Sequence, residues 1–254
     1  MSNFDRNTRF GAQVGGRASA DIDQGLRAYM LGVYNYMTLG LGVTGAVALG
    51  ANLLAVTHNA AGRLALTPFG QAIYTSPLRW LIVFAPLGFV MFFGAKAGSM
   101  SAATARTMFL AFAALIGLSM SFLLMVYTGG SVAQVFFVTA GAFGGLSLYG
   151  YTTRRDLSAM GSFLIMGVWG LVIAGIVNVF LHSSSLQFGL SILSVLIFSG
   201  LTAYDTQAIK DQYLESDGWE VAQKKSIFGA LSLYLDFINM FQSLLYLFGQ
   251  QRSN

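Results

Sequence analysis

Two aspartates, Asp205 and Asp236, are the only acidic residues that fall inside long apolar stretches of this chain. An ionised carboxylate at the centre of a bilayer costs on the order of 2.5–3.5 kcal/mol on insertion scales, so such residues usually have a function. The other eight acidic residues lie in polar segments before or between the apolar stretches. The chemistry to be explained is therefore that of two carboxyl groups held at membrane depth.

Asp236 belongs to a helical stripe of polar and small residues. It follows Ile227, where the last apolar stretch begins, by nine positions, which places it about 13 Å into the membrane. Residues three and four apart share one face of a helix, and this face carries Gly229, Ser232, Asp236, Asn239, Ser243 and Tyr246. Because a polar stripe does not face lipid, we expect it to face the bundle interior or a water-filled path. The alternative is that Asp236 only hydrogen-bonds a neighbouring helix.

Asp205 lies near the end of the preceding apolar stretch, where a carboxylate could also reach water. The short connection between the last two stretches makes them antiparallel, which brings Asp205 close to Asp236. Two carboxylates in one dry site do not both ionise easily, so they titrate as a unit. Such a pair would sense pH, and in its ionised form it would offer calcium the hard oxygen ligands that this ion prefers. We therefore predict that Asp205 and Asp236 form a pH sensor and a transient calcium site, supported by Ser232, Asn239 and Ser243.

Seven apolar stretches could position these residues. Each is near or above the roughly 20 residues that an α-helix needs to cross a bilayer: Tyr29–Val56, Leu78–Ala95, Thr107–Tyr127, Val132–Tyr151, Ala159–Leu181, Leu186–Thr206 and Ile227–Phe248. We predict an all-α integral membrane protein with seven transmembrane helices, in a membrane domain over residues 29–254. Residues 1–28 are polar and mixed in charge, and we expect them to form a flexible cytoplasmic arm.

The basic residues predict the orientation of the chain. Eleven of the fourteen lysines and arginines fall on the side of the N-terminus, and three fall on the other side: Arg63, Arg79 and Arg252. Cytoplasmic loops carry such an excess of positive charge. We therefore expect the N-terminus in the cytoplasm and the C-terminus outside.

The composition excludes several classes of protein. Of the 254 residues, 55% are hydrophobic and 9% are charged, whereas soluble domains carry roughly 25% charged residues. The chain has no cysteine, which excludes disulfides, thiolate metal sites and thiol nucleophiles. The basic residues stand singly or in pairs without forming a stripe, so we expect no binding to nucleic acid.

Two glycine motifs and two histidines have simpler explanations than a ligand site. Residues 40–45 match the dinucleotide fingerprint, but they lie in an apolar stretch with no preceding strand and no acidic residue about 20 positions on. Close helix packing explains them better, and we expect residues 141–145 to form a similar helix contact. His58 and His182 fall in predicted outer loops, far from any acid that would complete a metal site.

No pattern in the sequence predicts an enzyme. It contains no nucleophile–base constellation and no phosphate loop, so we expect no catalytic activity and no cofactor. Intramembrane aspartyl proteases also need two acids at membrane depth, but Asp236 lacks the Gly-x-Gly-Asp context that those proteases have.

The residues around the two aspartates resemble a known family. Residues 229–241, Gly-Ala-Leu-Ser-Leu-Tyr-Leu-Asp-Phe-Ile-Asn-Met-Phe, resemble the C-terminal signature of the transmembrane Bax inhibitor motif family, in a bacterial member. Residues 203–210, Ala-Tyr-Asp-Thr-Gln-Ala-Ile-Lys, resemble the motif of its penultimate helix. The hydropathy profile agrees over residues 29–249.

The resemblance implies a central last helix wrapped by the other six and a pH-sensitive calcium leak with a di-aspartyl sensor at Asp205 and Asp236. It also implies a basic latch residue, for which Lys96 is the nearest match. The implied location is the bacterial inner membrane, and a membrane-bound AAA protease is an implied partner. Our leading hypothesis is a cation leak channel or exchanger-like protein that handles calcium and protons in the lipid bilayer. The alternative is a regulatory membrane protein that modulates a protease or stress-response partner without transporting ions.

Overall fold

The computed structural model describes the backbone of residues 3–58 and 64–252, with side chains from Gln24 onward. Within these residues, seven helices are long and apolar enough to cross a membrane, which confirms the predicted all-α membrane fold. The helices that contain the spans are α1 (Asn3–Ala55), α3 (Leu78–Lys96), α4 (Ala102–Met120), α6 (Gly129–Thr152), α7 (Ser158–Leu181), α8 (Ser184–Asp211) and α9 (Trp219–Phe248). The third span continues from α4 into the short α5 (Leu123–Val126).

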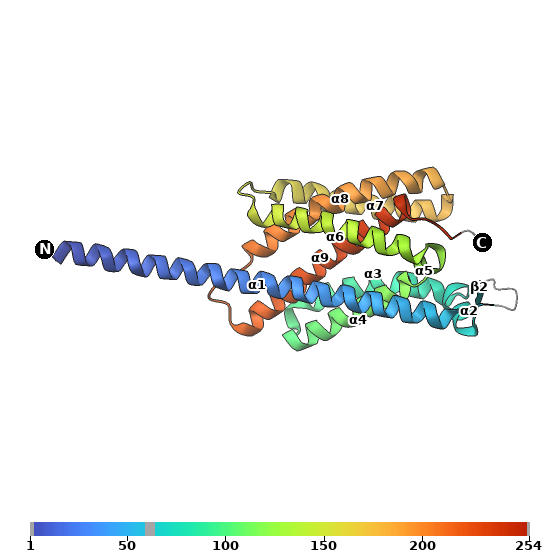
Figure 1. Ribbon diagram of the computed structural model, residues 1–254, viewed down its shortest axis with the longest axis horizontal. Coiled ribbons are helices and arrows are strands. Elements are labelled where there is room, and N and C mark those ends of the chain that lie inside the picture. The colour runs from blue at the N-terminus through green and yellow to red at the C-terminus, as the bar shows by residue number, and fades with distance from the viewer. Residues whose placement is uncertain (1–2, 59–63, 253–254) are drawn as a thin grey trace.

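The helices run up and down between two ends of the bundle (Figure 1). We call the end with residues 97–101, 153–157 and 212–218 the N-side, and the opposite end the C-side. The N-side is the end that the charge count predicts to be cytoplasmic. The C-side also carries an antiparallel hairpin and a short helix that the sequence did not predict: β1 (Val56–His58), β2 (Leu64–Leu66) and α2 (Pro68–Tyr74).

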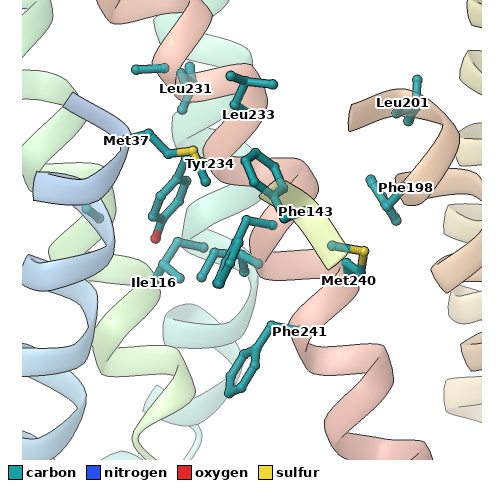
Figure 2. Packing of buried hydrophobic residues seen from close by; sticks show 14 of the residues in the cluster. Met37, Ile116, Phe143, Phe198, Leu201, Leu231, Leu233, Tyr234, Met240 and Phe241 are labelled. Atoms are coloured by element: carbon teal, nitrogen blue, oxygen red, sulfur yellow. The ribbon is translucent and has the colours of Figure 1, made fainter. Parts of the chain in front are cut away.

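Helix α9 is the central element of the core. Its main partners are α1, α4, α6 and α8, and Figure 2 shows side chains converging on it, among them Met37, Ile116, Phe143 and Phe198. Helix α3 packs mainly on α4, and α7 packs mainly on α8. The central position of α9 thus rests mainly on four neighbours, to which α3 adds the stacking of Phe93 on Phe228. Its wrapping by all six other spans is not confirmed.

Several helices extend farther than the apolar stretches predicted, among them α8 and α9. Helix α9 begins at Trp219, eight residues before Ile227, and α8 continues to Asp211. The added turns are polar and project beyond the apolar part of the bundle, so hydropathy alone did not detect them. An ion pair between Lys225 and Asp217, with Nζ and Oδ2 2.6 Å apart, ties α9 to the connecting loop.

Helix α1 begins at Asn3, so its backbone continues as helix through the segment that the sequence assigned to an arm. Most of the predicted arm, residues 1–28, lies outside the residues whose side chains are described. The division of the chain into an arm and a membrane domain stays a prediction.

The glycines of α6 correct one expectation. Of the three glycines in residues 40–45, Gly40 packs closely against Phe109 as predicted, whereas an added Cβ at Gly42 or Gly45 meets no described atom within 4 Å. On α6, however, Gly141 and Gly145 meet no described atom within 4 Å of an added Cβ, so the predicted helix contact at residues 141–145 is wrong. The close contact of α6 lies at Gly150, against the backbone of Ala203 in α8. Residue spacing identifies a helix face that is made of small residues, but it does not show whether another helix packs against that face.

Candidate functional site

A cavity of about 640 Å³ lies between α3, α4, α7, α8 and α9, and both predicted aspartates line it. Most of its wall is apolar, with residues such as Val83, Phe112 and Phe198. Its polar lining residues are Ser119, Asp205, Ser232, Asp236, Asn239 and Gln242. Four of these six belong to α9, and three of the four, Ser232, Asp236 and Asn239, form the middle of the predicted polar stripe, which therefore faces this cavity.

The structure brings the carboxyl groups of Asp205 and Asp236 together. Both line the same cavity, and their carboxyl groups lie close enough to share a hydrogen bond when one of them carries a proton. An ionised carboxylate only accepts hydrogen bonds, so this contact needs one proton on the pair. Their helices, α8 and α9, pack extensively against each other, which holds the two groups in place.

Asp236 is the more deeply buried member of the pair. Its side chain is 3% exposed, and its Oδ2 atom has no hydrogen-bond partner among the described residues. Asp205 is partly exposed. A buried polar atom without a partner is costly and rare in native structures. Water in the cavity or a cation would satisfy it.

The supporting residues that the sequence predicted divide into two groups. Ser232 and Asn239 line the cavity with the aspartates. The Nδ2 atom of Asn239 donates to the carbonyl of Leu235 over 2.8 Å, which leaves its Oδ1 for the cavity. Ser243 instead donates to Ser194 Oγ over 2.7 Å and so faces α8.

Gln242 takes the place in the cavity that the sequence had assigned to Ser243. It stands three positions after Asn239, so helical spacing from Asn239 could have identified it. The two neighbours differ by about 100° around the helix. Only the position of α8 decides which of them lines the cavity.

Lys96 is not brought to the aspartate pair. It is exposed at the N-side end of α3 and does not line the cavity. In the described part of the chain, no lysine or arginine forms an ion pair with Asp205 or Asp236. Lys96 is the last residue of α3, and this end of the helix packs on α9 through Phe93 and Phe228, but the Lys96 side chain itself is exposed.

A second cavity of about 250 Å³ continues from the first toward the C-side. Val83 and Ser119 line both cavities. Arg79 and Trp80 line the second one, and the Arg79 guanidinium lies 4.7 Å from the centre of the Trp80 ring. The aspartate cavity is therefore continued toward the C-side along α3 and α4.

The aspartate pair offers a small ion few protein ligands. No group of three or more His, Cys, Asp or Glu side chains gathers anywhere in residues 24–58 and 64–252. A cation at this site would rely on the two carboxyl groups, on the side-chain oxygens of Ser232 and Asn239, and on water. Such a sparse set suits an ion that passes through better than one that stays bound.

Comparisons with known proteins agree with this architecture. The model of the family "Inhibitor of apoptosis-promoting Bax1" matches residues 26–253. The chain is similar to an uncharacterized protein of Caulobacter vibrioides, with 46% identity over 93% of this chain and 94% of the relative. An uncharacterized protein of Rickettsia prowazekii is 44% identical over 91% of this chain and 93% of its own length. The inner membrane protein YbhL of Escherichia coli is 41% identical over 90% of this chain and 94% of its own length. The chain therefore belongs to the family described as "Inhibitor of apoptosis-promoting Bax1", whose match overlaps all seven of the spans described above.

Proposed function

We propose that this membrane protein is a pH-sensitive cation leak channel or exchanger-like protein of the bacterial inner membrane, with calcium as its ion. The contact between Asp205 and Asp236 inside a cavity of about 640 Å³ carries this proposal. Ions and water need such a space, and the carboxyl pair gives it a group that changes charge with pH.

The pair would act as a switch in which protons and calcium compete. With one proton, the two carboxyl groups share a hydrogen bond that ties α8 to α9. Without it, two negative charges face each other in a largely apolar cavity, where they repel or take up a divalent cation. The oxygens of Ser232, Asn239 and Gln242 continue the polar lining along α9.

Calcium flux into proteoliposomes tests the proposal. The full chain, reconstituted in vesicles that contain a calcium indicator, should show a flux that changes between acidic and neutral pH. Asp236→Asn and Asp205→Asn should flatten this dependence, because an amide does not titrate in this range. Asp211→Asn, at the exposed end of α8, is the matched control and should keep the wild-type profile. A wild-type pH profile in Asp236→Asn would contradict the proposed sensor.

A second candidate function is regulation of a membrane-bound protease or stress-response partner without ion transport. Exposed apolar side chains between α8 and the start of α9 favour it: Leu214, Trp219 and Val221 are 55%, 77% and 44% exposed. Deleting residues 1–25 and, separately, substituting Trp219→Ala should abolish function in a regulator. A leak protein should keep its calcium flux in both variants.

We propose no enzymatic role, because Asp236 lacks the Gly-x-Gly-Asp context of intramembrane aspartyl proteases. Cleavage of a transmembrane peptide by the purified chain, lost in Asp236→Asn, would overturn this assignment.

A further inference from the structure

A groove between α1 and α6 has no role in the proposed transport. Both helices pack on α9, which forms the floor of the groove through Phe237. In its N-side half the groove has a volume of about 890 Å³, which lies within the range of about 300–1,000 Å³ for ligand sites. It is lined almost entirely by apolar side chains.

The groove opens sideways toward lipid, because both of its walls are membrane spans. Leu31 on α1 and Leu148 on α6 stand at its rims and are 52% and 63% exposed. Gly144 lies in the wall between them, where an added Cβ would meet no described atom within 4 Å. The missing side chain keeps the groove wide at this level.

The depth of the groove matches one leaflet of a bilayer. Its α1 wall runs from Arg27 to Leu41, and the 14 helical steps between them measure about 21 Å along the helix. The hydrocarbon of one leaflet measures about 15 Å, and the headgroup region adds several more. A smaller cavity of about 310 Å³ continues on the C-side and shares Leu41, Phe136 and Phe237 with the first. These three large side chains mark the boundary near mid-membrane.

The charged group of the groove lies at its N-side end, and hydroxyl groups continue deeper along its described lining as far as Thr38. Arg27 lies at this end together with Tyr151. Deeper inside, the hydroxyls of Tyr34 and Ser147 are hydrogen-bonded to each other over 2.7 Å. From the N-side inward, the groove thus offers a cation, then hydroxyl groups, then a mainly apolar slot. This order matches the anionic headgroup, the ester region and an acyl chain of a phospholipid. Basic pockets between membrane helices on the cytoplasmic side bind anionic headgroups in the same way.

We propose that this groove binds one anionic phospholipid of the N-side leaflet. Its phosphate lies against Arg27, and an acyl chain runs along α1 and α6 down to Leu41. The site is separate from the aspartate cavity and does not depend on the proposed transport. A helix from a second copy of the chain would have to fill the same groove, so the experiment must separate lipid from protein as the occupant.

Native mass spectrometry of the full chain in detergent tests the proposal, with phosphatidylglycerol and phosphatidylcholine of equal chain length as probes. The wild type should retain one phosphatidylglycerol in preference to phosphatidylcholine. Arg27→Gln should weaken phosphatidylglycerol binding about ten-fold, as expected for the loss of a hydrogen bond between charged groups. Arg154→Gln, an exposed N-side residue outside the groove, should bind as the wild type does.

A second pair of variants tests the place of the acyl chain. Gly144→Phe fills the groove and should abolish lipid retention. Gly145→Phe adds the same side chain at the next residue, which does not line the groove and also has open space, and it should retain the lipid. Glycerol phosphate, which is a headgroup without chains, should not compete.

Equal retention of the two phospholipids by the wild type, wild-type binding by Arg27→Gln, or competition by glycerol phosphate would overturn the proposal. So would a Gly144→Phe variant that turns a dimer into a monomer while lipid retention stays unchanged, since a second copy would then be the occupant.

Discussion

Ser119 Oγ donates a hydrogen bond of 2.6 Å to the carbonyl oxygen of Ile82, which is the oxygen that Pro86 leaves without its helical donor. Proline has no N–H group, so the carbonyl four residues before it loses its normal partner. In a membrane no bulk water replaces that partner. The bond therefore joins α3 to α4 at the residue where the two cavities meet.

Ser119→Ala should lower the free energy of unfolding in detergent by about 1–3 kcal/mol, because the Ile82 carbonyl would be left unsatisfied. In a Pro86→Ala background the same substitution should cost less, since the substituted alanine has an N–H group that would again bond to the Ile82 carbonyl. Chemical unfolding of the two single variants and the double variant measures this coupling.

Ser162→Ala serves as the control for Ser119→Ala. Ser162 Oγ donates to Ser158 within α7 over 3.2 Å, and that carbonyl lies in an uninterrupted helix. This variant should change stability little. If Ser119→Ala lowered the free energy of unfolding equally with and without Pro86, the stabilising effect of Ser119 would not come from its bond to the Ile82 carbonyl.

The apolar stretches predicted the number of spans, because crossing a bilayer needs a minimum helix length. They did not predict where helices end in water. The first turns of α9, from Trp219, are polar and amphipathic, and only tertiary contacts such as Lys225 with Asp217 hold them. The β1–β2 hairpin was missed because such short strands have no sequence period of their own.

The candidate site was partly predictable for a similar reason. Antiparallel neighbours and helical spacing brought Asp205, Asp236 and Asn239 to one place, since these rules are local. Gln242 replaced Ser243 because the facing of α9 depends on how α8 packs against it. Pro86 could have been singled out as a proline inside an apolar stretch, but its partner Ser119 comes from another helix and has no signal in the sequence.

Gly150→Ala should destabilise the protein by about 1–3 kcal/mol through overpacking. An added Cβ at this position meets the backbone carbonyl of Ala203 in α8, which has little freedom to move. Gly141→Ala, on the same helix and in open space, is the matched control and should be neutral or stabilising by up to about 1 kcal/mol, because alanine favours the helix. Thermal unfolding of the two variants side by side checks the difference. If Gly141→Ala lost as much stability as Gly150→Ala, then Gly141 would also be closely packed, and the assignment of the close contact to Gly150 alone would be contradicted.

Gln207→Leu should loosen the loop between α6 and α7. The Gln207 side chain accepts from the Leu157 N–H and donates to the Arg155 carbonyl, both over 2.8 Å. Its loss leaves two backbone groups without partners, which should cost about 1–3 kcal/mol. Hydrogen exchange should become faster at Leu157. Gln71→Leu replaces an exposed glutamine on α2 and should leave hydrogen exchange in this loop unchanged. If exchange were also unchanged in Gln207→Leu, the two hydrogen bonds of Gln207 would contribute little to the stability of the loop.

Asp205→Asn and Asp236→Asn should not have additive effects on the pH dependence of calcium flux. The two carboxyl groups are partners in one buried contact, so a single proton equilibrium belongs to both. Removing either carboxyl group should therefore remove most of the pH dependence, and the double variant should lose little more. Residues that act as one unit give such non-additive cycles. If each single variant removed only half of the pH response and the double variant removed all of it, the two aspartates would be independent sensors, and the contact between them would be incidental to gating.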